Sequence, residues 1–383
     1  MDETLRIGVI GVGALALRGI LPHLSQDDVK GRVELAAVCD PVLERAEAAA
    51  KLYGVPHAFA SVEELLADAE IDAVTVASPI GLHYEHCRAS LESGKHVHVN
   101  KTMTTTVPEA DELIALAEQN DLHIVASPGD VLLPQVTRTR ELIEGGAIGE
   151  LCWAICGGAF GGYHEEETER RDAPGGAPID PGWYFRAPGG GPMYDMTAYA
   201  LHQLTSVVGP ARAVAAVSGI RIPEREFLGA RIPTEVDDNT VLLLEFGDGL
   251  FAVAYGAAAG RHSERFPSVL YLGTQGSIDG VHLNRDPFDF PGDELVIGER
   301  RSGHMRVLPH VVGVHRDLDE AHVFEDIMQL VDWTLDGTPS PVTAEHARHV
   351  IDIIESGYRA ARSGLRQELT TSFDLAPLGV LQP

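Results

Sequence analysis

The sequence predicts a two-domain α/β protein. A doubly wound parallel sheet forms the N-terminal domain, and a C-terminal α+β domain is built on a mostly antiparallel sheet. Three observations lead to this prediction. The chain has 383 residues, which is too long for one ordinary core. Its first third alternates between apolar runs and helical patterns. After that the alternation stops and strand-like runs follow, so we place the domains at residues 1–128 and 129–383.

Six strands are expected in the first domain, with helical patterns between them. Most of these strands are continuously apolar rather than alternating, which is typical of a parallel sheet with both faces covered. The expected strands cover residues 5–11, 33–40, 57–60, 71–78, 96–99 and 122–127, and the helices end near residues 24, 54, 68, 94 and 120.

The second domain begins with a linking helix over residues 132–150. The segment FGDGL, residues 246–250, is a hairpin signal between two apolar runs and favours antiparallel pairing. The remaining strand-like runs cover residues 211–222, 240–258 and 268–279, and two final helices are expected at about 317–336 and 343–363.

A glycine-rich turn follows the first strand directly. Gly11, Gly13 and Ala16 form the pattern G-x-G-x-x-A at the start of a helix. The first glycine permits the tight turn, the second lets a pyrophosphate approach the backbone, and Ala16 permits close packing of helix on strand. Asp40 closes the second strand, where a carboxylate accepts hydrogen bonds from an adenosine ribose. Together these residues predict a Rossmann dinucleotide-binding domain.

Asp40 also indicates which dinucleotide binds. A carboxylate there disfavours a 2'-phosphate, and Pro41 and Val42 offer no cation to hold one. We therefore expect NAD as the cofactor. NADP stays open, because Arg45 lies one helical turn further along.

Charge and composition exclude several classes of protein. The formal net charge of -28 argues against a nucleic-acid partner, because phosphates would be repelled. Mean hydropathy of -0.01 and the lack of a long apolar run argue against a membrane protein. The acidic start MDETLRIG is unlike a secretory signal, so we expect a cytoplasmic protein. The scattered cysteines and histidines complete no metal-ligand set, so no metal site is expected.

Lysine is rare in this chain. Only four of the 29 basic residues are lysine, and the last of them, Lys101, follows the fifth expected strand. A lysine can hydrogen-bond a reacting oxygen and lose its proton, whereas an arginine stays charged at any working pH. Lys101 is therefore a candidate catalytic residue; the alternative is a solvated loop residue.

The order of four segments resembles the glucose-fructose oxidoreductase, inositol dehydrogenase and MocA (Gfo/Idh/MocA) family. These segments are GKHVHVNKT at 94–102, LIEGGAIGEL at 142–151, GGGPMYDMTAY at 189–199 and EHARHVIDIIESGYRAARSG at 345–364. Members generally oxidise a sugar or cyclitol hydroxyl, or reduce the ketone, with a nicotinamide cofactor. The resemblance implies an NAD-dependent sugar or inositol dehydrogenase, with a small carbohydrate or polyol as substrate. It also implies a homodimer or homotetramer, since members commonly pair through the second-domain sheet.

The family typically carries Glu-Lys-Pro after its fifth strand, and this chain has Asn100, Lys101 and Thr102 there. The match implies an active-site role for Lys101 and a cofactor contact for Asn100. The family proline is usually cis, but a cis bond before Thr102 would cost about 3 kcal/mol, so we expect a trans bond. The missing glutamate removes an anion beside Lys101, which favours the neutral amine.

A second matching pattern is Asp-x-x-x-His or Asp-x-x-x-Tyr, which this chain carries as Asp195 and Tyr199. The resemblance implies that Asp195 holds a substrate hydroxyl and that Tyr199 acts as the base. With a reference pKa of about 10, the tyrosine would need the charge of Lys101 nearby to act near neutrality. His202, on the same face of the expected helix, is a rival base or a substrate contact.

Further candidates come from two turns and one long segment. Ser78, Pro79 and His83 match a family turn beside the nicotinamide. Three residues before the catalytic helix are either substrate contacts or packing residues: Trp183, Tyr184 and Arg186. The polar, glycine-rich segment 161–180 suits a loop that faces substrate or another subunit.

Two other functions fit the same residues. One is an NAD-assisted glycosidase or lyase that acts through a transient keto-sugar, as some relatives of this family do. The other is a non-catalytic, sugar-responsive regulator. Lys101, Asp195 and Tyr199 argue against the regulator, because a sensor needs no proton-transfer set.

Overall fold

The computed structural model describes residues 4–162, 179–227, 229–261, 269–292 and 308–378. The chain forms two compact units. The first comprises residues 1–129, 166–181 and 309–344, and the second comprises residues 130–165, 182–308 and 345–383. The segment expected at 161–180 as a substrate or subunit loop lies mostly outside the described residues.

The first unit contains a six-stranded sheet in the order β3-β2-β1-β4-β5-β6, with every pair parallel. This arrangement confirms the doubly wound sheet predicted from the alternating pattern. The order reverses between β1 and β4, and parallel α/β sheets bind ligands at the carboxyl ends of the strands at such a point. The strands are β1 (Leu5–Ile10), β2 (Val33–Cys39), β3 (His57–Phe59), β4 (Ala73–Val76), β5 (His96–Val99) and β6 (Ile124–Ala126).

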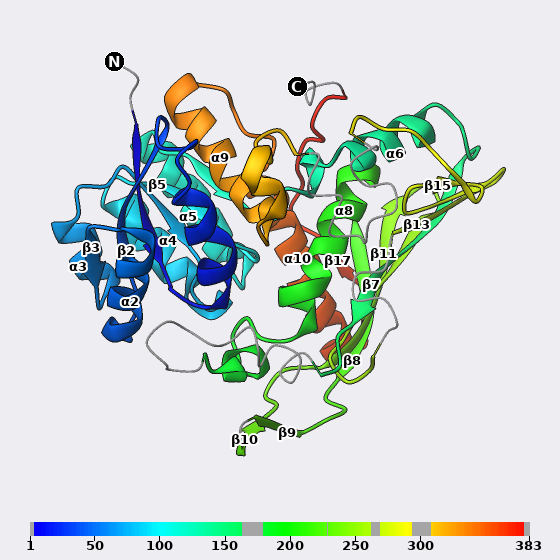
Figure 1. Cartoon of the computed structure of the whole chain (residues 1–383). Coiled ribbons are helices and arrows are strands. Elements are labelled where there is room, and N and C mark those ends of the chain that lie inside the picture. The colour runs from blue at the N-terminus through cyan, green and yellow to red at the C-terminus, as the bar shows by residue number, and fades with distance from the viewer. Residues whose placement is uncertain (1–3, 163–178, 228, 262–268, 293–307, 379–383) are drawn as a thin grey trace. The chain divides into compact units, whose positions relative to one another are not determined.

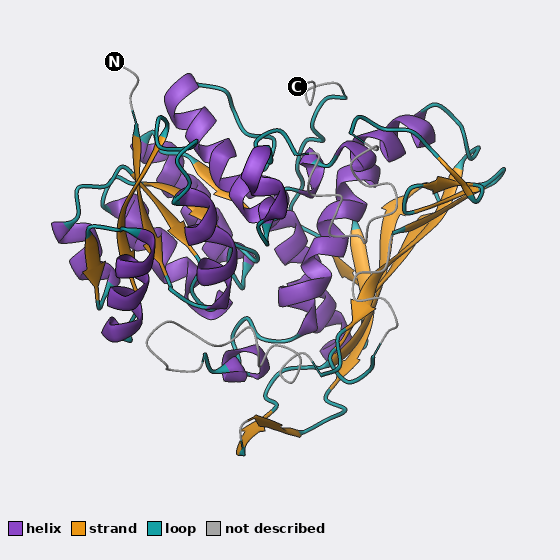
Figure 2. Cartoon of the chain, viewed as in Figure 1, coloured by secondary structure: helices purple, strands orange, loops and turns teal. Residues whose placement is uncertain are grey.

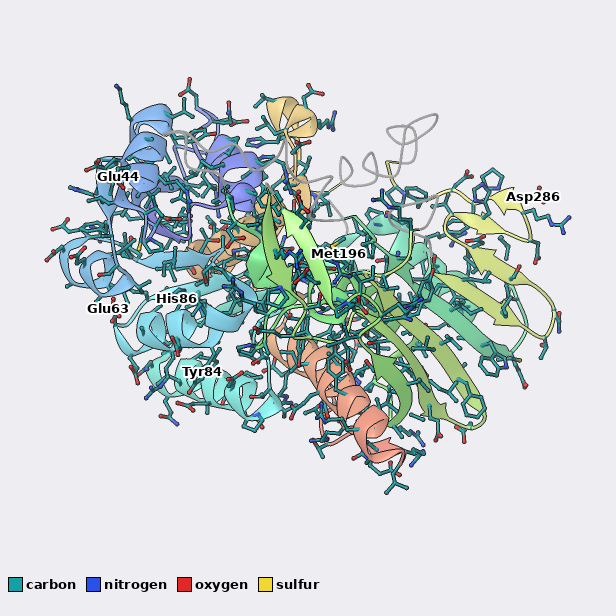
Figure 3. All side chains as sticks on the ribbon, turned by 90° about the horizontal axis from the view of Figure 1, so that it is seen from below. Glu44, Glu63, Tyr84, His86, Met196 and Asp286 are labelled. Carbon is teal, nitrogen blue, oxygen red and sulfur yellow. The ribbon has the colours of Figure 1, made fainter. Side chains whose placement is uncertain are left out.

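Helices cover both faces of this sheet (Figure 1). One face carries η1, α1 and α9, and the other carries α3, α4 and α5. Helix α2 lies on the same face as α1, because the connections between parallel strands are right-handed. The acidic side chains of Glu44 on α2 and Glu63 on α3 are exposed to solvent (Figure 3). The helices are η1 (Ala16–Ile20), α1 (Leu21–Leu24), α2 (Leu43–Tyr53), α3 (Val62–Asp68), η2 (Ile80–Leu82), α4 (His83–Glu92), α5 (Val107–Asn120), η9 (Gly313–Asp317) and α9 (Ala321–Asp336).

The second unit is built on a nine-stranded sheet in the order β16-β15-β14-β13-β7-β12-β11-β8-β17 (Figure 2). Only β7 and β12 pair in parallel, so the prediction of a mostly antiparallel sheet is confirmed. The strands are β7 (Leu151–Ala159), β8 (Ala213–Gly219), β11 (Asn239–Gly247), β12 (Leu250–Ala257), β13 (Leu270–Gly273), β14 (Ser277–Asp279), β15 (His282–Leu283), β16 (Asp286–Pro287) and β17 (Gln367–Glu368).

Two faces of this sheet differ in burial. Alternate residues of β11 are buried and exposed, and the side chain of Leu242 on the buried face meets α10 at Gly357. Val241 and Leu243 point the other way and are 47% and 39% exposed. The helices of this unit are η3 (Asp130–Leu132), α6 (Pro134–Glu144), η5 (Pro181–Phe185), η6 (Met193–Thr197), α8 (Ala198–Val208) and α10 (Ala344–Ser363).

Some elements differ from those expected. The sequence division at 129 places α9 in the second domain, whereas α9 packs on β5 and β6 within the first unit. The two-stranded ribbon of β9 (Glu224–Phe227) and β10 (Ala230–Pro233) was not predicted, because each strand is short and β10 ends in proline. Among the described residues, no helix is long and apolar enough to span a membrane.

Candidate active site

The glycine-rich turn lies where β1 meets the neighbouring strand β4. Gly11 has a φ of +94°, and a Cβ at this position would lie 2.8 Å from the backbone nitrogen of Ser78. A Cβ at Gly13 would meet no atom of the described structure within 4 Å. Ala16 is fully buried. Gly11 therefore permits the close turn, and the backbone at Gly13 is open to a ligand.

Asp40 follows β2 and is 4% exposed. One carboxylate oxygen accepts a hydrogen bond from the backbone N–H of Val12 at 3.0 Å. The other accepts from the N–H of Val42 at 2.9 Å and from the Arg45 guanidinium at 3.0 Å. A carboxylate has about four lone-pair positions, so Asp40 keeps acceptor capacity for a ribose.

The turn after β4 is tied to the segment after β5 by one histidine. The His83 ring is buried, with Nε2 2.8 Å from the Ser78 carbonyl and Nδ1 2.7 Å from the Thr102 carbonyl. Burial lowers the pKa of His83 to about 4, so the neutral ring donates to only one carbonyl at a time. Pro79, between these contacts, is exposed.

Lys101 lies directly after β5 and is 8% exposed. The preceding residue, Asn100, has a buried side-chain oxygen that accepts no hydrogen bond from the described residues. The bond between Lys101 and Thr102 is cis, so the expected trans bond is wrong. The expectation used only the local preference of a bond before a residue other than proline for the trans form. In the structure this loop also contacts the rest of the fold, through His83 and the Thr102 carbonyl.

These residues fit a dinucleotide. The open backbone at Gly13 suits a pyrophosphate, Asp40 suits a ribose, and the buried acceptor of Asn100 suits a donor such as a carboxamide. All of them belong to the first unit and follow the carboxyl ends of its strands. The structure thus places these cofactor candidates at one edge of the sheet, and their contacts with a cofactor stay a prediction.

Asp195 and Tyr199 belong to the second unit. Asp195 is 2% exposed and lies in the π-helical turn η6, and Tyr199 is half-buried in the first turn of α8. A continuous α-helix was expected, whereas the structure has a π turn here that packs closely on β12. A Cβ at Gly256 would lie 2.4 Å from Oγ1 of Thr197 in this turn. Such π turns are frequent at functional sites.

His202 points into the interior of the second unit. It is 2% exposed, and its ring centroid lies 4.6 Å from that of His346 on α10. Burial lowers the pKa of His202 to about 3, with a smaller contribution from the charge of His349. In this environment the imidazole is neutral over the working range of pH.

The aromatic residues before η6 have different surroundings. Tyr184 is fully buried in a core cluster with Phe185, and Trp183 is partly buried against the same cluster. The side chain of Arg186 is exposed. Of the three substrate candidates, Trp183 and Arg186 thus retain accessible surface, whereas Tyr184 is a packing residue in this structure.

The sequence did not single out a cluster of three residues, two of which interact electrostatically with Lys101. Arg18, on η1, donates from Nε to Glu320 at 2.9 Å, and Nδ1 of His322 lies 3.7 Å from the other oxygen of Glu320. The charge of Lys101 affects the pKa of both residues on the α9 side. Arg18 is far in sequence from Glu320 and His322, so the sequence pattern does not indicate this cluster. The one available signal was a charged residue, Arg18, in the apolar start of a helix.

Comparisons with known proteins agree with this architecture. Residues 5–127 match the model of the oxidoreductase family with an NAD-binding Rossmann fold, and residues 136–279 match the GFO/IDH/MocA C-terminal domain. A levoglucosan dehydrogenase solved with NADH and L-sorbose superposes with a TM-score of 0.72 at 19% identity, covering 96% of this chain and 100% of that chain. The WlbA dehydrogenase of Bordetella pertussis, solved with NADH and UDP-GlcNAcA, gives a TM-score of 0.71 at 18% identity, covering 97% and 100%.

Relatives by sequence include enzymes that act on cyclitols and sugars. A scyllo-inositol 2-dehydrogenase (NADP(+)) of Bacillus subtilis is 23% identical, covering 94% of each chain. A levoglucosan dehydrogenase of Pseudarthrobacter phenanthrenivorans is 26% identical over 63% of this chain and 64% of its own length. The two family models together match more than half of the sequence. The chain therefore belongs to the Gfo/Idh/MocA family of oxidoreductases, and residues 5–127 form the NAD-binding Rossmann domain of that family.

Proposed function

We propose that this protein is an NAD-dependent dehydrogenase of a sugar, a sugar derivative or a cyclitol. The observation that carries the proposal is Lys101, which is buried at the carboxyl edge of the NAD-binding sheet. Ligands of such sheets bind at this edge. The sugar and inositol dehydrogenases among the relatives support the substrate class.

Bound NAD would supply the acceptor for a hydride from the carbinol carbon of the substrate. The chain's own residues would manage the proton of the same hydroxyl. Asp195 would hold a substrate hydroxyl, Lys101 would hydrogen-bond the reacting oxygen, and Tyr199 would take the proton. Tyr199 is favoured over His202 because Tyr199 keeps exposed surface, whereas His202 is buried.

Two features support NAD over NADP. The Asp40 carboxylate would repel a 2'-phosphate, and Arg45, the nearest cation after β2, is engaged with that carboxylate. The B. subtilis relative is named for NADP, so the preference is a proposal about this chain and does not extend to the whole family.

A substrate screen tests the proposal. The protein would be mixed with NAD and a panel of monosaccharides, glycosides and inositols, and NADH would be followed by its absorbance. We expect turnover of at least one polyol. Cleavage of a glycoside without net NADH would indicate the transient keto-sugar route instead. NAD binding with no turnover of any polyol or glycoside would indicate a regulator.

A further inference from the structure

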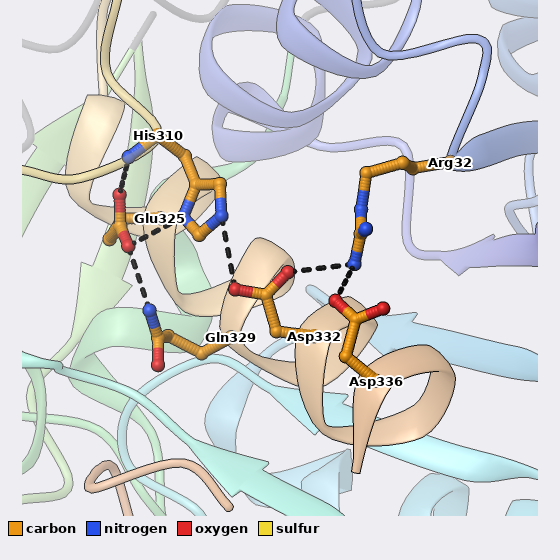
Figure 4. A network of polar contacts seen from close by, with 6 residues as sticks. All are labelled: Arg32, His310, Glu325, Gln329, Asp332 and Asp336. Atoms are coloured by element: carbon orange, nitrogen blue, oxygen red, sulfur yellow. Dashed lines mark hydrogen bonds and ion pairs between the residues drawn. The ribbon is translucent and has the colours of Figure 1, made fainter. Parts of the chain in front are cut away.

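Helix α9 runs along the sheet of the first unit in the direction opposite to the strands. At its start, Glu320 is paired with Arg18, which follows the glycine turn at the carboxyl edge. At its end, Asp332 lies 2.9 Å from Arg32, which precedes β2 at the opposite edge, and Asp336 pairs with the same arginine (Figure 4). The first turn of α9 therefore lies at the edge where Lys101 leaves β5.

Contacts in the middle of α9 fix its register against β5. Asp326 accepts hydrogen bonds from the Ser127 hydroxyl and, at 3.1 Å, from the Gly129 N–H. The Ser127 hydroxyl is in turn 3.0 Å from Nε2 of His98, which lies on β5 shortly before Lys101. His322 precedes Asp326 by one helical turn, about 6 Å, on the same face of α9. It therefore lies beside the end of β5.

The backbone at Glu320 is in an uncommon conformation. Its φ is 58°, in the left-handed region that residues other than glycine rarely adopt. A Cβ added to Gly19 would lie 2.3 Å from the Cβ of Glu320, so the two segments touch at a distance that glycine permits. Such backbone conformations cluster at functional sites, where the surrounding structure holds them in place.

The charges around Lys101 come from three elements. Burial alone would raise the pKa of Glu320, but the charges of His322, Arg18 and Lys101 together lower it. Burial lowers the pKa of His322; the charge of Glu320 opposes this shift, and those of Lys101 and Arg18 add to it. His83 faces Lys101 from the α4 side. At neutral pH the cluster thus contains the carboxylate of Glu320 and the guanidinium of Arg18, which stays charged at any working pH.

His23, on α1, is a further titratable group that faces Glu320. Burial lowers the pKa of His23 to about 4, so its ring is neutral near pH 7. His23 therefore adds no charge to the cluster near pH 7.

We propose that Glu320 is the positioning residue for Lys101: its carboxylate, reaching the carboxyl edge from α9, provides the negative charge that Asn100 does not. The role matters for catalysis only if Lys101 acts as proposed above. The carboxylate would favour the charged amine and keep it at the carboxyl edge of the sheet. The proposal thus replaces the expectation that the missing glutamate, by removing an anion beside Lys101, favours the neutral amine.

The test follows Lys101 directly. Because the chain has only four lysines, a protein carrying ¹³C-labelled lysine gives four Cε signals, and a Lys101→Met variant assigns one of them. In Glu320→Gln we expect the titration of Lys101 to move to lower pH, with Lys30, Lys51 and Lys95 unchanged. Adding Asn100→Glu to Glu320→Gln should move it back. An unchanged Lys101 titration in Glu320→Gln would overturn the proposal.

Kinetic measurements provide a second test of the role of Glu320 once a substrate is known. Glu320→Gln should lower kcat about tenfold or more, with the KM for NAD nearly unchanged, because the lysine is no longer held in place. Glu320→Asp should keep most of the activity. Asp336→Asn is the matched control, since it removes a contact at the other end of α9 and should leave the pH profile in place. An equal effect of both changes would mean a structural role only.

The proposed function and this inference can fail separately. If the wild-type protein oxidises no polyol, the dehydrogenase assignment fails, and the Lys101 titration still decides whether Glu320 acts on the lysine. If the wild-type protein is active, and the Glu320→Gln variant keeps both the wild-type rate and the wild-type titration of Lys101, only the inference fails.

Discussion

Asp40 and Arg45 form an ion pair, and breaking this pair should change which cofactor the protein prefers. Their contact of 3.0 Å engages Arg45 as long as the carboxylate is present. Asp40→Ala should weaken NAD binding by roughly ten- to a hundredfold, because hydrogen bonds to a charged group contribute about 1.5–3 kcal/mol. NADP binding should improve relative to NAD, since Arg45 is released. Fluorescence titration with both cofactors measures the ratio, and an unchanged ratio would contradict the role of Asp40.

Tyr199 and His202 predict different pH profiles. For a tyrosine base coupled to Lys101, kcat/KM for oxidation should rise with pH through an apparent pKa below about 10. A histidine with its pKa lowered to about 3 is already deprotonated across that range and adds no rise. We therefore expect Tyr199→Phe to lose the alkaline limb and His202→Ala to keep its position. The opposite pattern would assign the base to His202.

Helices α8 and α10 enclose three buried histidines that should make the second unit sensitive to acid. Burial lowers the pKa of His202 to about 3 and that of His349 to about 4, and it lowers the pKa of His346 well below the ordinary value. The unfolded chain takes up protons near pH 6.5, while the folded chain resists them until a lower pH. The stabilising contribution is therefore complete above pH 6.5 and is lost as pH falls toward 4.

Urea unfolding at several pH values measures this effect. Each neutral histidine should contribute a loss of about 1.4 kcal/mol per pH unit between those limits. His349→Gln should reduce the slope, whereas the same change at His57, which is exposed, should not. A free energy of unfolding that stays constant from pH 7 to pH 5 would contradict the assignment.

At the scale of elements, the sequence predicted what depends on local pattern. Continuous apolar runs and helical periodicity were enough to predict the parallel sheet, and FGDGL was enough to predict the turn between β11 and β12. The π turn at Asp195 packs closely on Gly256, and residues at and near the start of α9 contact partners such as Arg18 and Ser127. Those partners are distant in sequence, so local periodicity cannot predict the contacts with them.

At the scale of the whole molecule, the open face of the second sheet predicts a homo-oligomer. Trp153 on β7 is 41% exposed, Val217 on β8 is 78% exposed, and two residues of β11 join them on this face. An apolar face of this kind normally finds a partner. Light scattering should therefore give a multiple of the chain mass of 41.1 kDa.

Substitutions on that face sharpen the prediction. The double change Val241→Glu and Leu243→Glu places charges on the central strand β11 and should yield monomers. Leu52→Glu, at an exposed leucine on α2 in the first unit, is the control and should leave the mass unchanged. A wild-type mass near that of one chain at micromolar concentration would contradict the assignment of this face.

The dehydrogenase assignment depends most on Lys101, and the chain offers a matched control for it. Lys51 is an exposed lysine on α2, away from the strand ends that hold the cofactor residues. The measurement is kcat/KM for NAD-dependent oxidation of the polyol that the screen identifies, in Lys101→Met and in Lys51→Met. We predict a loss of about a hundredfold or more for Lys101→Met and no loss for Lys51→Met. Wild-type kcat/KM in Lys101→Met would contradict the account.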